Sequence, residues 1–293
     1  MEAYRVATLL AGGPDSSNAA AIEVTATGPE LEAIGGPCRV AVACAGDVGV
    51  AVIRAGGGEE AIAPLTSTTL RPGDVLHVGR VRDVLRAYVA VSGGITVEPQ
   101  LGSRSACTRG GLEGLLARAL RQGDVLPLDP ATCEGRGLES TMPRPQRFDD
   151  QSPLAVCDGP QSDRLSTDDA RALFDGSTVF RAATAIDRTG VRLEAPRITL
   201  RGGHDVASQG CPAGALQIAS AESAIVLGPD RGTTGGYAIP AVVARFDLAR
   251  VGRIRPGAAV RMTRIDNADH ADELGRLRSA ELDDLAASLR PTE

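Results

Sequence analysis

Apolar and small polar residues alternate with a period of two over residues 20–28, which is the pattern of a strand. Further strands are expected over residues 39–46, 48–53 and 87–91. A short helix is expected near Ala3–Ala11, where the apolar side carries Tyr4, Ala7, Leu9 and Leu10. Short strands dominate, so the predicted fold class is mainly β with a few short helices.

A turn-and-strand pattern recurs along the chain. Leu70–Leu76 (LRPGDVL) resembles Leu120–Leu126 (LRQGDVL), and Ile254–Val260 (IRPGAAV) is a weaker copy. Each copy predicts a turn at its glycine followed by a strand. Because such units are common, the recurrence alone does not establish a duplication.

A shift in composition divides the chain into two β-rich parts. Residues 128–148 are rich in Pro, Gly, Arg and Asp, as linkers are. We therefore expect a first β subdomain over residues 1–127, a linker over 128–148, a second β subdomain over 149–268 and a C-terminal helix over 269–293.

The second half also carries two helical signals. Ser166 is expected to cap a helix, with Asp169 completing a variant of the capping box. The terminal helix, from about Asp269 to Leu289, carries a stripe made by Leu274, Leu277, Leu282, Leu285 and Leu289. We expect the stripe to dock on its own domain, and binding of a partner is the alternative.

Composition excludes several classes of function. The net charge of -6, without a basic patch, argues against nucleic-acid binding. No apolar run approaches the ~20 residues of a membrane-spanning helix, and the N-terminus has no signal-peptide pattern. The 6 cysteines are scattered, which indicates reduced thiols in a cytoplasmic protein. Three dispersed histidines, His77, His204 and His270, give no metal-ligand spacing and argue against a Ser-His-Asp triad.

The chain contains no lysine, and all 31 basic residues are arginine. It therefore cannot carry biotin on a lysine, and it has neither a Walker A lysine nor a Schiff-base lysine. If biotin or ATP takes part in its reaction, the usual lysines must come from another chain or be replaced by arginine.

Six segments, in order, resemble one protein family. They are Tyr88–Ile95 (YVAVSGGI), Leu101–Gly111 (LGSRSACTRGG), Arg118–Leu126 (RALRQGDVL), Asp187–Leu193 (DRTGVRL), Ser208–Ile218 (SQGCPAGALQI) and Asp230–Tyr237 (DRGTTGGY). Through them the chain resembles the family of the C component of 5-oxoprolinase, also called allophanate hydrolase subunit 2 or KipA-like, which has a biotin-dependent carboxyltransferase-like domain. The resemblance runs from about Arg5 to Arg261.

The resemblance implies two cyclophilin-like β-barrel subdomains. It also implies a hydrolase component that acts with the B component of 5-oxoprolinase (KipI-like or allophanate hydrolase subunit 1-like) and a third protein in the ATP-dependent opening of 5-oxoproline to glutamate. The same module serves urea carboxylase by moving a carboxyl group from biotin to urea, so ATP or carboxybiotin would be shared with the partner. A KipA-like regulatory binding module is the third hypothesis, because one fold can serve several functions.

The sequence departs from the family pattern in three places. The family begins with a strand and the segments TTVQDxGRxG and GVPxSGAMD, whereas this sequence begins at the helix that follows them. We therefore expect either a start site placed late or a divergent member. Thr189 stands where the family has Met, and Gln209 stands where it has an acidic residue.

The segment Asp230–Tyr237 is the first candidate site. It combines hydroxyls with bare backbone, which suits the close approach of an anion, at Thr233, Thr234, Gly235, Gly236 and Tyr237. Arg231 offers a forked cation for a carboxylate or phosphate. The alternative is a tight turn held by an Asp–Arg pair. The catalytic residues are unassigned, with Arg231, Arg104 and Asp230 as candidates.

Three further groups of residues are candidates for binding or for local structure. Ser103, Arg104 and Ser105 place hydroxyls beside a guanidinium, either to bind an anion or to tether a loop. Gln217 could hydrogen-bond a lactam or urea, both of which offer C=O and N–H edges, or it could face outward from its strand. Asp187 and Arg188 are expected to form an ion pair that orders the turn ending at Gly190.

Overall fold

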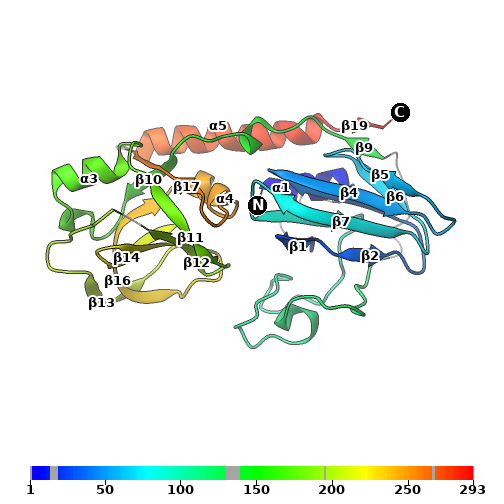
Figure 1. Cartoon of the computed structure of the whole chain (residues 1–293), viewed down its shortest axis with the longest axis horizontal. Helices are drawn as coiled ribbons and strands as arrows, with labels where there is room; N and C mark the ends of the chain where they lie inside the picture. The colour runs from blue at the N-terminus through cyan, green and yellow to red at the C-terminus, as the bar shows by residue number, and fades with distance from the viewer. Residues whose placement is uncertain (1, 14–18, 130–138, 195, 266–267, 293) are drawn as a thin grey trace. The chain divides into compact units, whose positions relative to one another are not determined.

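The computed structural model describes residues 2–13, 19–129, 139–194, 196–265 and 268–292, and the chain is mainly β with a few helices, as the alternation predicts (Figure 1). Two compact units make up the chain. The first comprises Met1–Asp149 and Leu282–Glu293, and the second comprises Asp150–Glu281. Residues 130–138 of the predicted linker lie outside the described residues.

The first unit contains two four-stranded antiparallel sheets, with strand orders β1-β8-β3-β6 and β2-β7-β4-β5. Their strands are β1 (Ile22–Thr25), β2 (Glu30–Glu32), β3 (Cys38–Cys44), β4 (Asp47–Ile53), β5 (Glu59–Ala61), β6 (Ser67–Leu70), β7 (Val75–Arg82) and β8 (Arg86–Val91). Val24 and Val42 of one sheet share a buried apolar cluster with Val52 and Leu76 of the other. The two sheets therefore pack face to face.

Strand β3 shows how the sequence builds these layers. All of its residues are buried, and successive side chains point to opposite faces of the sheet. Val40 and Val42 enter the cluster between the sheets, whereas Ala41 and Ala43 enter a second cluster with the helix α1 (Glu2–Leu10). Because alanine is small, the helix backbone can lie close to this face of the sheet. The predicted N-terminal helix is confirmed.

The remaining elements of the first unit are short. They are η1 (Gly114–Ala117), η2 (Gln146–Phe148) and the two-stranded sheet of β9 (Ser140–Thr141) and β19 (Arg290–Pro291). The strand predicted after the turn in Leu120–Leu126 is wrong, because residues 125–127 are irregular. After this turn, among residues 125–129, Leu128 alone makes an isolated bridge, to Ile95.

The second unit is built on one large sheet with the strand order β17-β11-β12-β15-β14-β16-β10-β18, and β13 also pairs with β16. Its strands are β10 (Leu154–Asp158), β11 (Phe180–Ile186), β12 (Gly190–Glu194), β13 (Asp205–Gly210), β14 (Ala215–Ser220), β15 (Ser223–Leu227), β16 (Thr234–Val243), β17 (Ala259–Val260) and β18 (Met262–Arg264). β17 and β18 stand at opposite ends of this order, but only Arg261 separates them along the chain. The sheet therefore curls into a nearly closed barrel.

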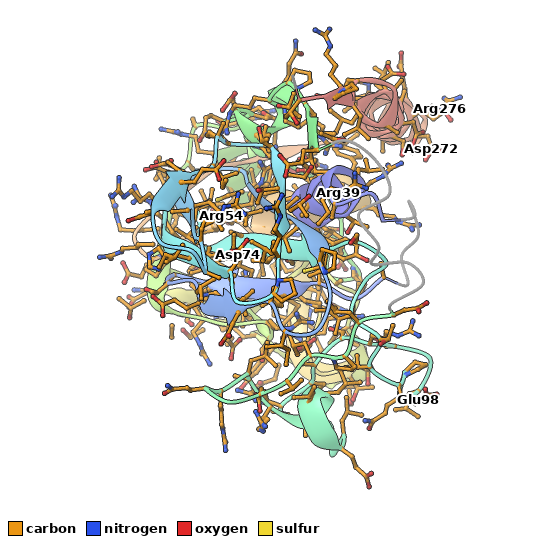
Figure 2. All side chains as sticks on the ribbon, turned by 90° about the vertical axis from the view of Figure 1, so that its right-hand side faces the viewer. Arg39, Arg54, Asp74, Glu98, Asp272 and Arg276 are labelled. Carbon is orange, nitrogen blue, oxygen red and sulfur yellow. The ribbon has the colours of Figure 1, made fainter. Side chains whose placement is uncertain are left out.

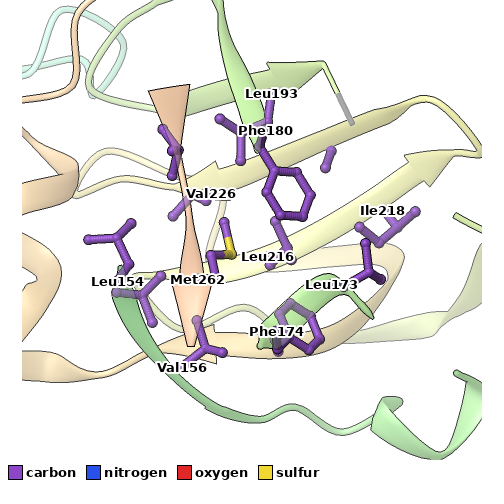
Figure 3. Close-up of a cluster of buried hydrophobic side chains, with 14 of the residues drawn as sticks. Leu154, Val156, Leu173, Phe174, Phe180, Leu193, Leu216, Ile218, Val226 and Met262 are labelled. Atoms are coloured by element: carbon purple, nitrogen blue, oxygen red, sulfur yellow. The ribbon is translucent and has the colours of Figure 1, made fainter. Parts of the chain in front are cut away.

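The interior of this barrel is filled by aliphatic side chains and a few larger ones (Figure 3). Phe180, Leu216, Ile218 and Met262 are each 0% exposed. Phe174 packs into the same cluster from the helix α3 (Thr167–Phe174). This rigid interior supports the strands that carry the candidate site on the second unit.

The helical elements of the second unit include η3 (Ser162–Arg164), η4 (Arg245–Asp247) and α4 (Leu248–Val251). The predicted cap of α3 is confirmed. The Asp169 backbone N–H donates to Ser166 Oγ at 3.0 Å, and that hydroxyl lies 2.7 Å from the Asp169 carboxylate.

The last helix, α5 (Ala268–Ala287), confirms the predicted C-terminal helix, but its leucines have different surroundings. Leu285 is 7% exposed and packs, with Leu289, in the cluster that contains α1. Leu277 is 62% exposed, so the leucine stripe is buried only in part. None of the described helices combines the length and the apolar character needed to span a membrane.

Candidate functional site

The first candidate segment begins in the turn before β16 and runs into that strand. β16 pairs here with β13, with Thr234 opposite Gly210 and Gly235 opposite Gln209. Thr233 and Thr234 are exposed, and Tyr237 is 44% exposed. The hydroxyls predicted to face a ligand are thus accessible to one.

Arg231 is anchored at one edge of its guanidinium. Its Nε–H donates to the Cys211 carbonyl at 2.7 Å, and Nη1 makes only long contacts of 3.5 and 3.4 Å with the carbonyls of Gly228 and Pro229. Nη2 has no hydrogen-bond partner among the described residues. Because a guanidinium carries five N–H donors, Arg231 keeps donors for an anion while its position is fixed.

Asp230 is engaged in a structural contact. Its carboxylate accepts from Arg188 Nε at 2.8 Å and from Nη2 at 3.1 Å, and its backbone N–H donates to the Arg188 carbonyl at 2.9 Å. Asp187 Oδ1 accepts from the backbone N–H groups of Thr189 and Gly190, which orders the turn ending at Gly190. The forked contact with Arg188 favours a structural role for Asp230 over a catalytic one.

Gln217 is the buried polar residue of this region, with 7% of its surface exposed. Its Nε2–H donates to Cys211 Sγ at 3.3 Å, and Oε1 has no hydrogen-bond partner among the described residues. Sulfur is a weak acceptor, so the amide is only loosely committed. This oxygen is not among the fully buried, unpaired side-chain atoms of the described residues, so a ligand or water can reach it and donate a hydrogen bond to it.

Gly235 lies directly against this amide. A Cβ atom at residue 235 would lie 2.8 Å from Gln217 Nε2 and 3.0 Å from Cys211 Sγ. The next glycine, Gly236, has room for a side chain apart from the Val206 carbonyl at 3.4 Å. Of the two glycines, it is therefore Gly235 that the packing around Gln217 requires.

Cys211 links these residues and was not predicted from the sequence. Its backbone N–H donates to the Thr233 carbonyl at 2.9 Å, its carbonyl holds Arg231, and its thiol, in a residue 4% exposed, faces Gln217. The structure thus brings Gln217, Gly235 and Arg231 together around one residue. A sequence pattern could not show this, because the contacts depend on the pairing of β13, β14 and β16.

The second candidate segment, Ser103–Ser105, belongs to the first unit. It follows a two-residue turn in which Leu101 and Gly102 have φ angles of 51° and 76° and Gln100 pairs with Ser103. Arg104 Nε–H donates to the Val97 carbonyl at 2.8 Å, and the Ser105 backbone N–H donates to Ser103 Oγ at 3.1 Å. These contacts are those of a tethered loop, and anion binding here stays a prediction.

The described residues contain no group of three or more His, Cys, Asp or Glu side chains that could hold a metal ion. The chemistry available around Cys211 is instead that of an amide, a guanidinium and exposed hydroxyls. Such a set can bind a small, polar, uncharged or anionic molecule through hydrogen bonds.

Comparisons with known proteins place this geometry in context. Residues 1–264 match the family described as carboxyltransferase domain, subdomain A and B. The chain is 30% identical over 284 residues to urea amidolyase of Saccharomyces cerevisiae, a match that covers 89% of this chain and 15% of the relative. It is 25% identical over 265 residues to the C component of 5-oxoprolinase from Escherichia coli, a match that covers 89% of this chain and 79% of the relative.

A solved structure agrees with these matches. The crystal structure of Kluyveromyces lactis urea carboxylase superposes with a TM-score of 0.82 at 25% identity, over 100% of this chain and 27% of that chain. This chain therefore spans only a small part of the urea amidolyase and urea carboxylase chains, but most of the 5-oxoprolinase component. These relatives are parts of enzymes by name, and the likeness to one of their domains confirms the expected fold.

Proposed function

The chain belongs to the carboxyltransferase domain family, subdomains A and B, and from this membership we propose that it is one component of an ATP-dependent 5-oxoprolinase. In this proposal it works in the cytoplasm with a KipI-like partner, the B component of that enzyme, and a third protein. Together they open the lactam ring of 5-oxoproline to give glutamate. The Escherichia coli relative is named as one component of a 5-oxoprolinase, and this chain covers most of it, which supports a shared, multi-subunit role.

The observation that carries the proposal is the meeting of Gln217 and Arg231 at Cys211. 5-Oxoproline combines a lactam, with a C=O and an N–H on one edge, and a carboxylate. Gln217 offers an amide oxygen that no described residue engages and that can accept the lactam N–H. Arg231 offers guanidinium donors for the carboxylate. Cys211 thus contacts both the amide that suits the lactam and the guanidinium that suits the carboxylate.

The other residues of the segment complete the proposed cleft. Gly236 presents backbone without a side chain, so that its N–H can approach charge that develops on the lactam oxygen, whereas Gly235 pairs with Gln209 in the ladder and leaves room beside Gln217. Thr233 and Thr234 offer exposed hydroxyls nearby. ATP, shared with the partner protein, would supply the free energy that makes ring opening favourable. No lysine of this chain takes part, since it has none.

A carboxyltransferase that acts on urea with carboxybiotin is the second candidate. The 30% identity to Saccharomyces cerevisiae urea amidolyase favours it. Urea presents the same C=O and N–H edge to Gln217 but carries no carboxylate. Arg231 therefore separates the two candidates, because urea offers no carboxylate for a charge-assisted contact with its remaining donors.

The test is to co-express the chain with the neighbouring gene product that resembles the KipI-like partner, add the third protein, and measure 5-oxoproline-dependent ATP hydrolysis. Arg231→Ala is expected to raise KM for 5-oxoproline by about tenfold to a hundredfold, because a charge-assisted contact is lost. Arg192→Ala, an exposed arginine on β12, is the matched control and should behave as the wild type.

The outcomes separate the candidates. Turnover that depends on 5-oxoproline and weakens in Arg231→Ala, while the complex stays intact by size-exclusion chromatography, supports the 5-oxoprolinase. A stable complex that is inert toward 5-oxoproline but carboxylates urea with a biotin carrier supports the second candidate. A stable complex inert toward both substrates rejects both enzymes and leaves regulatory binding.

A further inference from the structure

Gln161 makes an unusual contact with strand β16. Its backbone N–H donates to the Ile239 carbonyl at 3.1 Å, and its side-chain Oε1 accepts from the Ile239 N–H at 2.9 Å. One residue therefore satisfies both backbone groups of Ile239, as a neighbouring strand would. Ile239 is 0% exposed, so water cannot replace either bond.

The position of this contact explains why it is needed. On β16, residues 234–237 pair with β13 and residues 241–243 pair with β10. Ile239 lies between these two segments. Gly159 brings the chain close to this place, because a Cβ at residue 159 would lie 2.1 Å from the Ile239 carbonyl oxygen. Gln161 thus fills the interval between two partner strands of β16.

Gln161 also holds β13. Its Nε2–H donates to Gln209 Oε1 at 3.0 Å, and Gln209 Nε2–H donates to Gln161 Oε1 at 2.9 Å, so the two amides close a ring of two hydrogen bonds. Arg164, three residues later, adds bonds from Nη1 to the carbonyls of Gly203 and Asp205 at 2.9 and 3.0 Å. The segment around η3 is therefore fixed to both strands.

β13 leads directly into the candidate site. Gln209 pairs with Gly235 across the ladder and precedes Cys211 by two residues. Cys211 in turn contacts Gln217 through its thiol and Arg231 through its carbonyl. A shift of Gln209 would move Gly235 and Cys211 relative to Gln217.

We propose that Gln161 is a positioning residue for the amide-binding site, which it holds in register through Gln209 on one side and Ile239 on the other. It does not touch the substrate. The proposal rests on the proposed function for its effect on turnover, because the lactam is the ligand assigned to Gln217. Gln161 was not predicted from the sequence, since its two partners are 48 and 78 residues away.

The test uses the intact complex and three variants. Gln161→Ala removes the side-chain contacts with both Gln209 and Ile239. Gln209→Ala removes the amide ring and the 3.3 Å contact of Gln209 Nε2 with the Tyr237 carbonyl, but it keeps the bond from Ile239 to Gln161. Gln151→Ala changes an exposed glutamine of the same unit as a control. Gln161→Ala and Gln209→Ala are each expected to raise KM for 5-oxoproline about tenfold and to leave KM for ATP unchanged. Hydrogen exchange of the Ile239 amide is expected to speed up in Gln161→Ala but not in Gln209→Ala.

Two results would overturn the proposal. The first is a Gln161→Ala complex with wild-type KM and wild-type exchange at Ile239. The second is a variant that loses thermal stability and kcat without any selective change in KM for the amide substrate, which indicates a structural role alone. If the wild-type complex does not turn over 5-oxoproline, the proposed function fails separately. Exchange at the Gly235 and Cys211 amides then decides: faster exchange in Gln161→Ala than in Gln151→Ala supports positioning, and equal exchange rejects it.

Discussion

The two units contain turns of the same sequence pattern that differ in one functional group. Arg71-Pro72-Gly73-Asp74 of the first unit corresponds to Arg255-Pro256-Gly257-Ala258 of the second. In both turns the fourth residue donates its N–H to the carbonyl of the first, at 2.9 Å for Asp74 and 3.1 Å for Ala258. The glycines have φ angles of 85° and 77°, a region that favours glycine.

The two turns are also docked by the same pair of backbone bonds. Gly73 N–H donates to the Ala33 carbonyl at 2.8 Å, and Ala33 N–H donates to the Asp74 carbonyl at 2.9 Å. In the second unit the partner is Ala182, with bonds of 2.8 and 2.9 Å to Gly257 and Ala258. The second unit thus has the same backbone pattern without the carboxylate.

The carboxylate adds a different connection. Asp74 accepts from the backbone N–H groups of Arg71 and Ala55 and from Arg54 Nη1, each at 2.9 Å, and Figure 2 shows Arg54 and Asp74 together. In the second unit Ala258 has no polar side chain to make such bonds. Glycine and the backbone therefore form the turn, whereas the aspartate connects the turn to the residues that follow β4.

A third copy isolates the contribution of the carboxylate. Asp124 accepts from the Arg121 backbone N–H and from Arg118 Nη1 and Nη2, each at 2.7 Å. Residues 125–127, which follow this turn, form no strand. A carboxylate can therefore organise the turn outside a sheet, and the sheet can hold the turn without a carboxylate.

The largest effect is expected from Asp74→Asn. The substitution places an N–H donor opposite the donors of Arg71 and Arg54 at a position that is 3% exposed, so bonds are lost and donors are left unpaired. We expect the midpoint of thermal unfolding to fall by several degrees, as measured by calorimetry. Asp124→Asn is the control. It should lower the midpoint much less, because its turn lies outside the sheets. Equal decreases in Asp74→Asn and Asp124→Asn would show that the Asp74 carboxylate stabilises the protein no more than the Asp124 carboxylate does.

Acid titration tests the contribution of the Asp74 carboxylate separately. The backbone N–H groups of Arg71 and Ala55, followed by the Arg54 guanidinium, lower the pKa of Asp74 from 3.8 to about 2. A lowered pKa means that this contribution to stability is complete above the unfolded-state value of 3.8 and is lost as the pH falls toward 2. The difference in urea midpoint between wild type and Asp74→Asn should therefore shrink on going from about pH 5 to about pH 3. A difference that stays constant with pH would contradict the assignment. The pKa values of Asp124 and Asp175 are also lowered. Both groups are present in the wild type and in Asp74→Asn, so their contributions cancel in the difference between the two.

The glycines test whether the two turns are equivalent in backbone strain. Gly73→Ala and Gly257→Ala both force an L-residue into the left-handed region, at a cost of about 1–2 kcal/mol. Gly73→Ala should cost more, because its new Cβ would lie 3.0 Å from the Ala55 Cβ, whereas nothing lies within 4 Å at Gly257. Urea unfolding, monitored by hydrogen exchange in each unit, would measure the loss of stability in Gly73→Ala and in Gly257→Ala. A larger loss of stability in Gly257→Ala than in Gly73→Ala would show that backbone strain is not equal in the two turns.

Much of the fold follows from local patterns. Continuous runs of Val and Ala in residues 39–46 and 87–91 predict β3 and β8, whose side chains are buried on both faces apart from the half-buried Tyr88. The cap at Ser166 is equally local. The short charged strands β2 and β5 were not predicted, since Glu30–Glu32 and Glu59–Ala61 have little apolar pattern and depend on neighbouring strands.

The candidate site is less accessible to sequence reasoning. Residue type alone drew attention to Gln217 and Arg231, because amides and guanidinium groups bind small polar ligands. Their common partner Cys211 depends on strand pairing, and the partner of Asp230 is Arg188, 42 residues away. Contacts of this kind are set by the register of the sheet, which a single sequence does not specify.

The smallest expected effect comes from building the missing carboxylate into the second unit. In Ala258→Asp the new side chain can accept from the Arg255 N–H, as Asp74 does from Arg71. Ala258 also packs against the core of its unit, so burial of a polar group offsets part of the gain. We expect a net stabilisation of a few tenths of a kcal/mol at neutral pH that disappears in acid, when the carboxylate is protonated.

Ala258→Asn is the matched control for this gain, because asparagine can accept the same bond but does not titrate between about pH 5 and pH 3. If the gain in Ala258→Asp is electrostatic, only the aspartate variant should lose its advantage in acid, as measured by the urea midpoint of the second unit. A loss of stability at neutral pH in both variants would mean that the packing of Ala258 outweighs the new bond. Ala258 would then be explained by its packing against the core, and the two turns would resemble each other only in their backbone bonds.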